Sequence, residues 1–180
     1  MVNLPNLLTL FRLFISPVGA FCLLKEKIDC SLTVLIFAAA TDFLDGFLAR
    51  RFNAETILGK ILDPLADKVL VISYLGAVYF SPFNEKPSYF LLTLVLLKEV
   101  TVIGGGAFLL LKRKIPSPTF AGKVSTTFLF VYLLCYLSYV GGNLSKSSLE
   151  FVEWITSLSL VWAIASYLQR GIKELVNVVP

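Results

Sequence analysis

The chain has no histidine and few charged residues, and each shortage excludes a class of protein. Of its 180 residues, none is histidine and only 16% are charged. Without histidine there is no His-based nucleophile relay, general base or metal site. A soluble domain is about one quarter charged, whereas 57% of this chain is hydrophobic. The composition therefore predicts an integral membrane protein with a single domain over residues 1–180.

Cysteine is also scarce. Cys22, Cys30 and Cys135 are far apart in the sequence and odd in number. They have neither the spacing of a disulfide framework nor that of a zinc-binding cysteine pair. We therefore expect three unpaired, buried and chemically inert thiols.

Long apolar stretches recur along the whole chain. A membrane-spanning helix needs about 20 mostly apolar residues. The predicted helices cover residues 7–24, 32–50, 60–80, 88–111, 121–141 and 149–170. The first stretch lacks the basic segment and the cleavage site of a signal peptide, so we expect it to be retained. The predicted fold is an all-α membrane protein with about six transmembrane helices.

Lysine and arginine are distributed unevenly between the turns, which predicts the orientation of these helices. Basic residues accumulate on the cytoplasmic side of a membrane. With a cytoplasmic N-terminus, the basic residues on that side are Arg50, Arg51, Lys60, Lys112, Arg113, Lys114, Lys123, Arg170 and Lys173. The opposite turns hold only Lys25, Lys27, Lys86 and Lys146. We therefore expect both termini at the cytoplasmic face of the cell (inner) membrane.

Four aspartates interrupt the apolar sequence around the turn between the second and third predicted helices. Asp42 and Asp45 are three residues apart and Asp63 and Asp67 are four apart, so each pair shares one helix face. Because the turn is short, the two helices should be antiparallel neighbours whose carboxylates meet at the cytoplasmic end. One unpaired aspartate in a bilayer costs about 2.5–3.5 kcal/mol, and four like charges repel one another.

A divalent cation, or a pair of them, would neutralise this cluster. Oxygen ligands without histidine or cysteine favour Mg²⁺, Mn²⁺ or Ca²⁺ over zinc, and carboxylate-bound Mg²⁺ usually also holds substrate phosphates. Gly46 and Gly59 leave room for a ligand to approach, and Arg50 offers a planar pair of donors to phosphate oxygens. Thr56 adds a hydroxyl, and a carboxylate partly free of metal is a candidate general base. These residues predict metal-assisted phosphoryl chemistry at a membrane surface.

Two other interpretations of the aspartates remain open from the residues alone. The acids could form structural ion pairs with neighbours such as Lys60 and Lys68, which would explain one or two of them. They could also line the pathway of an ion-binding transporter. Transport acids usually lie near the middle of the membrane and often recur in a repeated half, whereas these four gather near one end of two helices.

The segment from Asp42 to Asp67 reads D-x2-D-G-x2-A-R-x8-G-x3-D-x3-D. This pattern resembles the signature of the CDP-alcohol phosphotransferases at every fixed position. Residues 3–9 with Arg12, and residues 62–68, further resemble the bacterial phosphatidylglycerophosphate synthases of that family. The resemblance implies the family's six-helix fold, which is typically a homodimer, over the whole chain.

The resemblance also implies roles for individual residues. The implied metal ligands are Asp42, Asp45, Asp63 and Asp67. The implied contacts of the CDP-diacylglycerol headgroup are Gly46, Arg50, Thr56 and Gly59. Asp67 would also accept the proton of an acceptor hydroxyl, which attacks the phosphorus next to diacylglycerol and releases CMP. Two Mg²⁺ or Mn²⁺ ions would neutralise the diphosphate.

The implied acceptor is glycerol 3-phosphate, which gives phosphatidylglycerophosphate. The alternative is phosphatidylglycerol, the acceptor of cardiolipin synthases, or another alcohol such as inositol phosphate. This alternative stays open because Lys98-Glu99 stands where many of these synthases have Arg-Glu, and residues 104–106 are glycines where a second arginine is common. The expected partners are these lipids, the acceptor and a second copy of the chain, with no nucleic acid.

Candidate acceptor-binding residues are Lys98, Lys123 and Arg170. Adjacent residues on a helix do not face each other. Lys98 and Glu99 should therefore have separate partners, which for Lys98 is an acceptor phosphate or an acid on another helix. Lys123 is equally well explained as a membrane-surface anchor, and Arg170 as a side chain that reaches the interface from the end of the last helix.

Overall fold

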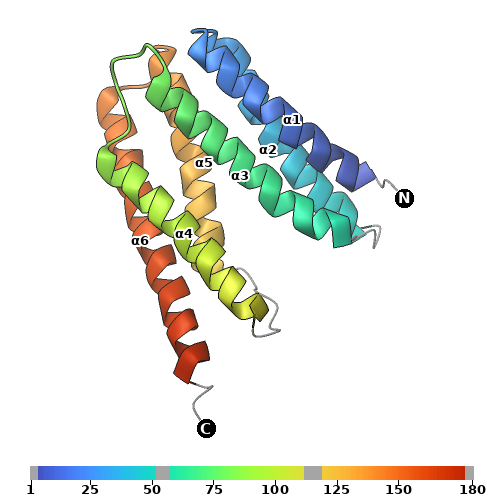
Figure 1. The fold of residues 1–180 in the computed structure, drawn as a ribbon. Helices are drawn as coiled ribbons and strands as arrows, with labels where there is room; N and C mark the ends of the chain where they lie inside the picture. Colours follow the sequence, from blue (N-terminus) through green and yellow to red (C-terminus); the bar gives the residue numbers. More distant parts are fainter. Residues whose placement is uncertain (1–3, 52–56, 112–118, 177–180) are drawn as a thin grey trace. The chain divides into compact units, whose positions relative to one another are not determined.

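The computed structural model describes residues 4–51, 57–111 and 119–176. Figure 1 shows that this part of the chain forms helices and contains no strand. The helices are α1 (Leu4–Leu24), α2 (Ile28–Arg51), α3 (Ile57–Phe80), α4 (Tyr89–Leu111), α5 (Phe120–Val140) and α6 (Lys146–Val176). Each predicted apolar stretch corresponds to one helix, which confirms the all-α prediction. α6 extends beyond the predicted residues 149–170 at both ends.

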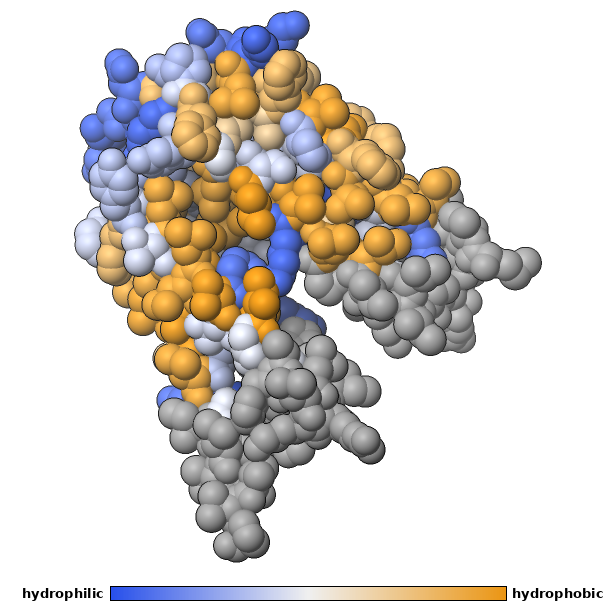
Figure 2. Space-filling view, viewed as in Figure 1, coloured by the Kyte–Doolittle hydropathy of each residue, from blue (hydrophilic) through white to orange (hydrophobic). Residues whose placement is uncertain are grey.

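Within the described residues, four helices are long and apolar enough to cross a membrane by length and composition. These spans are Asn6–Leu24, Tyr89–Gly106, Phe120–Val140 and Lys146–Gly171. α2 and α3 are not among the spans found in the described residues. Figure 2 shows hydrophobic residues over much of the described surface that faces the viewer, as lipid contact requires. The chain is a membrane protein, whereas six spans and cytoplasmic termini stay predictions.

The contacts within the chain divide it into two compact units. The first comprises residues 1–86 and 136–144 and contains α1, α2 and α3. The second comprises residues 87–135 and 145–180 and contains α4, most of α5 and α6. The single domain expected over residues 1–180 stays a prediction.

In the first unit, α1 packs against both α2 and α3. Its buried face repeats at helical spacing and consists of Asn6, Thr9, Arg12, Ser16, Gly19, Ala20 and Leu23. A Cβ at Gly19 would collide with the hydroxyl of Tyr74 and lie 2.6 Å from Val34 Cγ1. The fully buried Tyr74 of α3 donates a hydrogen bond to the Ser31 carbonyl of α2 at 2.8 Å. The missing side chain therefore lets three helices approach one another closely.

The turn between α1 and α2 ends the first helix by a Schellman motif. The Lys27 amide donates to the Cys22 carbonyl at 2.9 Å, and the Glu26 amide donates to the Leu23 carbonyl at 3.0 Å. Glu26 is in the left-handed region at φ 59°, a place usually taken by glycine. The chain thus reverses tightly between residues 24 and 28.

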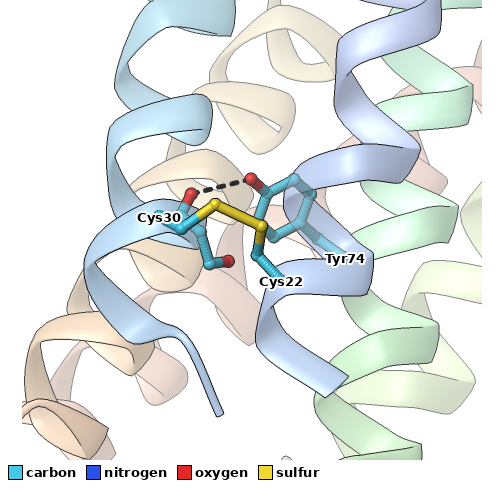
Figure 3. Close-up of a disulfide and its surroundings, with 4 residues drawn as sticks. Cys22, Cys30 and Tyr74 are labelled. Carbon is cyan, nitrogen blue, oxygen red and sulfur yellow. Dashed lines mark hydrogen bonds between the residues drawn. A yellow bond between two sulfur atoms is a disulfide. The ribbon is translucent and has the colours of Figure 1, made fainter. Parts of the chain in front are cut away.

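This reversal brings Cys22 and Cys30 together in a disulfide, with Cα atoms 6.0 Å apart. Figure 3 shows the disulfide beside Tyr74. The sequence-based expectation of unpaired thiols is wrong for these two residues and holds for Cys135. Each paired cysteine lies within one helical turn of the predicted loop between two antiparallel helices. This position on either side of the loop indicates that the two cysteines are close in space, which their spacing in the sequence alone does not.

In the second unit, each helix begins with a hydroxyl cap. Ser88, Thr119 and Ser145 accept hydrogen bonds from the amides three residues later, at 3.1, 3.1 and 3.3 Å. Such caps satisfy amides that the helix itself leaves without partners. Glu153 of α6 also accepts from the Ser88 amide at 2.9 Å, which joins α6 to the start of α4.

Candidate active site

Three of the four predicted aspartates converge on one arginine of α1. Arg12 Nη1 donates to Asp42 of α2. Arg12 Nη2 lies 3.8 Å from Asp63 Oδ1, and Nη1 lies 3.8 Å from Asp67 Oδ1, both on α3. Thr9, one turn before Arg12, donates to Asp63 Oδ1 at 2.8 Å. The structure thus brings carboxylates from α2 and α3 to one point.

The two sides of this cluster differ in exposure. The Arg12 side chain is only 1% exposed, whereas Asp42, Asp63 and Asp67 are 54%, 48% and 46% exposed. The guanidinium therefore contacts the carboxylates from the buried side, and the carboxylates extend toward the surface. The cluster therefore has a fixed positive charge on its buried side and can bind a ligand on its exposed side.

The close contact of Arg12 with the aspartates was not found by sequence reasoning, which noted Arg12 only as part of the family resemblance. The available signal was a charged residue in an apolar first helix, on the same face as Asn6 and Thr9. A buried arginine within the membrane is costly unless it is paired. Four aspartates in an otherwise apolar sequence were the obvious partners.

The remaining predicted residues of this region are described only in part. The side chains of Asp45 and Arg50, the surroundings of Gly46 and all of Thr56 lie outside what the structure describes. Gly59 lies in the first turn of α3 and is half-buried. The roles assigned to these residues, to Asp67 as base and to the aspartates as metal ligands stay predictions.

The donor set suits a hard divalent cation. Within the described part of the chain, no group of three or more acidic, cysteine or histidine side chains is arranged to hold a metal ion. Asp42, Asp63 and Asp67 nevertheless present carboxylate oxygens within 4 Å of one cationic group, and these are the ligands that Mg²⁺ and Mn²⁺ prefer.

The second unit contains the predicted acceptor residue Lys98. This buried side chain donates to Glu99 Oε1 at 2.9 Å and contacts Thr126 Oγ1 of α5 at 3.4 Å. The expectation that Lys98 and Glu99 have separate partners is wrong. The spacing rule describes where Cβ atoms point, but the flexible four-carbon stem of lysine can turn back to its neighbour in a buried site.

Lys123 and Arg170 lie on helices that pack together. Lys123 is exposed on α5, one turn before Thr126. Arg170 is half-buried on α6, one turn after Ser166, whose hydroxyl donates to Thr119 Oγ1 at 3.2 Å, directly before α5. A Cβ at Gly122 would collide with Tyr167, so α5 and α6 are in close contact here. Acceptor binding by Lys98, Lys123 and Arg170 stays a prediction.

Comparison with known proteins identifies the family. The sequence profile of the CDP-alcohol phosphatidyltransferases matches residues 2–166. The chain belongs to this family. Its relatives include a CDP-diacylglycerol–glycerol-3-phosphate 3-phosphatidyltransferase of Aquifex aeolicus strain VF5, which is 38% identical over 96% of either chain. The enzyme of the same name from Rickettsia bellii is 34% identical over 92% of this chain and 93% of its own.

A cardiolipin synthase (CMP-forming) of Rattus norvegicus is also similar, at 29% identity. The match covers 95% of this chain but 62% of the rat protein. Membership of the CDP-alcohol phosphatidyltransferases confirms the resemblance drawn from residues 42–67 and makes the chain an enzyme. The transporter interpretation of the aspartates is therefore set aside. Members of this family generally depend on a divalent metal.

Proposed function

We propose that the chain transfers the phosphatidyl group of CDP-diacylglycerol to glycerol 3-phosphate, giving phosphatidylglycerophosphate and CMP. The observation that carries this proposal is the end-to-end similarity to relatives named for this reaction, at 38% and 34% identity. The aspartate cluster around Arg12 supports the same chemistry, because it offers hard oxygen ligands from two helices.

In this proposal, the carboxylates of Asp42, Asp45, Asp63 and Asp67 hold Mg²⁺ or Mn²⁺, as two ions. When bound, these ions supply positive charge that neutralises the diphosphate and the charge developing on the leaving CMP. Asp67 accepts the proton of the acceptor hydroxyl. The hydroxyl oxygen forms a bond to the phosphorus of the phosphatidyl group as the bond between that phosphorus and the CMP oxygen breaks. Gly46, Arg50, Thr56 and Gly59 bind the CDP moiety.

The proposed setting is the cell (inner) membrane, with six spans, both termini cytoplasmic, the active site at the cytoplasmic face and a homodimeric assembly. The diacylglycerol chains can stay in the bilayer while the diphosphate reaches the aspartates. The disulfide supports this orientation. Cys22, near the C-terminal end of α1, and Cys30, in the first turn of α2, flank the turn between these helices. That turn would be extracytoplasmic, and disulfides persist mainly outside the reducing cytosol.

Lys98, Lys123 and Arg170 are the proposed contacts of the acceptor phosphate. Lys98 already has Glu99 as a partner, so a phosphate at Lys98 would share or replace that contact. The same pairing, together with the 29% identity to a cardiolipin synthase, keeps phosphatidylglycerol as a second candidate acceptor. Phosphatidylglycerol needs less positive charge than glycerol 3-phosphate, which carries a phosphate monoester.

Product analysis tests the proposal. The purified protein would be incubated with CDP-diacylglycerol and Mg²⁺, with glycerol 3-phosphate, phosphatidylglycerol or inositol phosphate offered separately. CMP release and the lipid product would be followed. We expect CMP and phosphatidylglycerophosphate only with glycerol 3-phosphate. Turnover only with phosphatidylglycerol would replace the proposed acceptor, and no CMP from folded protein with any acceptor would contradict the proposed reaction.

A further inference from the structure

Arg12 lies at a position that would also attract the proposed divalent cation. Its guanidinium pairs with Asp42 and stands 3.8 Å from one oxygen of Asp63 and of Asp67. The donor atoms come from α1, whereas the acids belong to α2 and α3. The same three carboxylates are therefore shared between a fixed internal cation and a cation that arrives from outside.

We propose that Arg12 is the resident counter-cation of this cluster, which stabilises the acids before a divalent cation binds and opposes that cation afterwards. The inference rests on the proposed function only in the statement that these acids bind a divalent cation. It assigns Arg12 a role in setting the affinity for that cation, in addition to its contribution to packing.

Arg12 has opposite effects on the protein without the divalent cation and on the protein that has bound it. Without the cation, Arg12 contributes positive charge that reduces the repulsion among Asp42, Asp63 and Asp67 from their buried side. With the cation bound, the attraction between Arg12 and these acids is offset by repulsion between Arg12 and the cation. Removing the charge of Arg12 should therefore destabilise the cation-free protein more than the cation-bound protein, and the cation should bind more tightly.

The competing effect is positional, since acids released by Arg12 would move apart and bind the cation less well. Packing limits that effect. Ala38 lies one turn before Asp42 and Ala66 directly before Asp67, and both are buried, so packing should hold the backbones of α2 and α3 without the guanidinium. One charge within about 4–6 Å shifts the proton affinity of a carboxyl by about 10–1000-fold. A divalent cation carries twice the charge of a proton, so the electrostatic effect should dominate.

The consequence is a site that binds the divalent cation weakly by itself. The diphosphate of a liponucleotide would add the negative charge that Arg12 offsets. Cation and lipid substrate would then bind more tightly together than either does alone, which is a positive coupling between two ligands.

The test measures Mn²⁺ binding by electron paramagnetic resonance on the full chain in an uncharged detergent, without substrate. Arg12→Gln removes the charge and Arg12→Lys keeps it. Ser16→Ala is the matched control, because Ser16 is equally buried one turn later and donates to the Arg12 carbonyl at 2.6 Å. Thermal unfolding of the same samples, with and without Mn²⁺, provides a second readout that does not depend on activity.

We expect Arg12→Gln to bind Mn²⁺ at least about tenfold more tightly than the wild type. Its melting temperature should be lower without Mn²⁺ and should rise more when Mn²⁺ is added. Arg12→Lys and Ser16→Ala should bind Mn²⁺ as the wild type does. Unchanged or weaker binding by Arg12→Gln would overturn the proposal, because a purely structural or positioning role gives those results.

Each remaining outcome also supports or contradicts the proposal. Recovery of folded Arg12→Gln protein only in the presence of Mn²⁺ supports it. Failure to recover it even with Mn²⁺ contradicts it, because the divalent cation should be able to replace the guanidinium. If the wild type releases no CMP yet Arg12→Gln shows the expected change in Mn²⁺ binding, the proposed function fails and this inference stands. If the wild type turns over normally and Mn²⁺ binding is unaltered in Arg12→Gln, this inference fails and the proposed function stands.

Discussion

Replacing Gly19 by alanine tests whether the close contact of α1 with α3 supports the first unit. A Cβ at position 19 would collide with the Tyr74 hydroxyl and lie 2.6 Å from Val34 Cγ1. The Tyr74 ring cannot simply move aside, because it is fully buried and its hydroxyl is bonded to the Ser31 carbonyl. Overpacking of this kind costs about 1–3 kcal/mol, while alanine gains about 0.8–1 kcal/mol over glycine as a helix former.

Gly76→Ala is the matched control, because it lies on α3 of the same unit and a Cβ there meets nothing within 4 Å. The helix-forming gain is common to both variants, so Gly19→Ala should be less stable than Gly76→Ala by the overpacking cost alone. For a protein of this size, 1 kcal/mol shifts the melting temperature by about 2–4 °C. The expected difference is therefore about 2–12 °C, measured by thermal unfolding in detergent.

A third variant identifies the atom responsible. Tyr74→Phe removes the hydroxyl that the new Cβ would meet, so Gly19→Ala should cost less in that background than in the wild type, by about 0.5 kcal/mol or more. Because position 19 is seven residues from Arg12 on the same buried face of α1, about 10 Å along the helix, a displaced α1 should also move Arg12. Equal melting temperatures for the two alanine variants would refute the close-packing argument.

The other predictions concern the reaction and the first turn. Asp67→Asn should lower turnover by about 10²–10⁴-fold, as expected for loss of a general base. Binding of CDP-diacylglycerol, measured by calorimetry, should stay close to that of the wild type, and normal turnover would exclude Asp67 as the base. Lys98→Gln should raise KM for glycerol 3-phosphate more than it lowers kcat, and an unaltered KM would remove Lys98 from the acceptor site. Glu26→Gly should stabilise the protein by up to about 1 kcal/mol. The φ of 59° at this position costs a residue with a side chain about 1–2 kcal/mol, which exceeds the extra entropy cost of glycine, about 0.5–1 kcal/mol; a lower melting temperature would contradict that account.

The six helices could be predicted from the sequence because their signal is local. Each is an apolar stretch of about 20 residues between turns that contain charged residues, glycine or proline. The change from apolar to polar residues also marks individual helix ends. α1 ends directly before Lys25, and α4 begins directly after the capping Ser88. Whether all six cross the membrane stays a prediction, because four helices meet the length and composition of a span within the described residues.

Three features could not be predicted from spacing. The Cys22–Cys30 disulfide depends on how sharply the chain turns at Glu26, which has an uncommon positive φ for a residue other than glycine. The Lys98–Glu99 pair depends on side-chain reach rather than on helical position. Both are decided by local geometry that the sequence pattern does not specify.

The third feature, the contact of Arg12 with three aspartates, depends on residues that are far apart in the chain. Arg12 and Asp42 are 30 residues apart, and Thr9 and Asp63 are 54 apart. Sequence patterns predicted that the acids of α2 and α3 would meet, because the turn between those helices is short. They did not indicate that α1 contributes a cation to the same point. An apolar helix with one arginine must nevertheless pair that charge, and the cost of leaving it unpaired in a membrane makes the acid-rich end of α2 and α3 its expected partner.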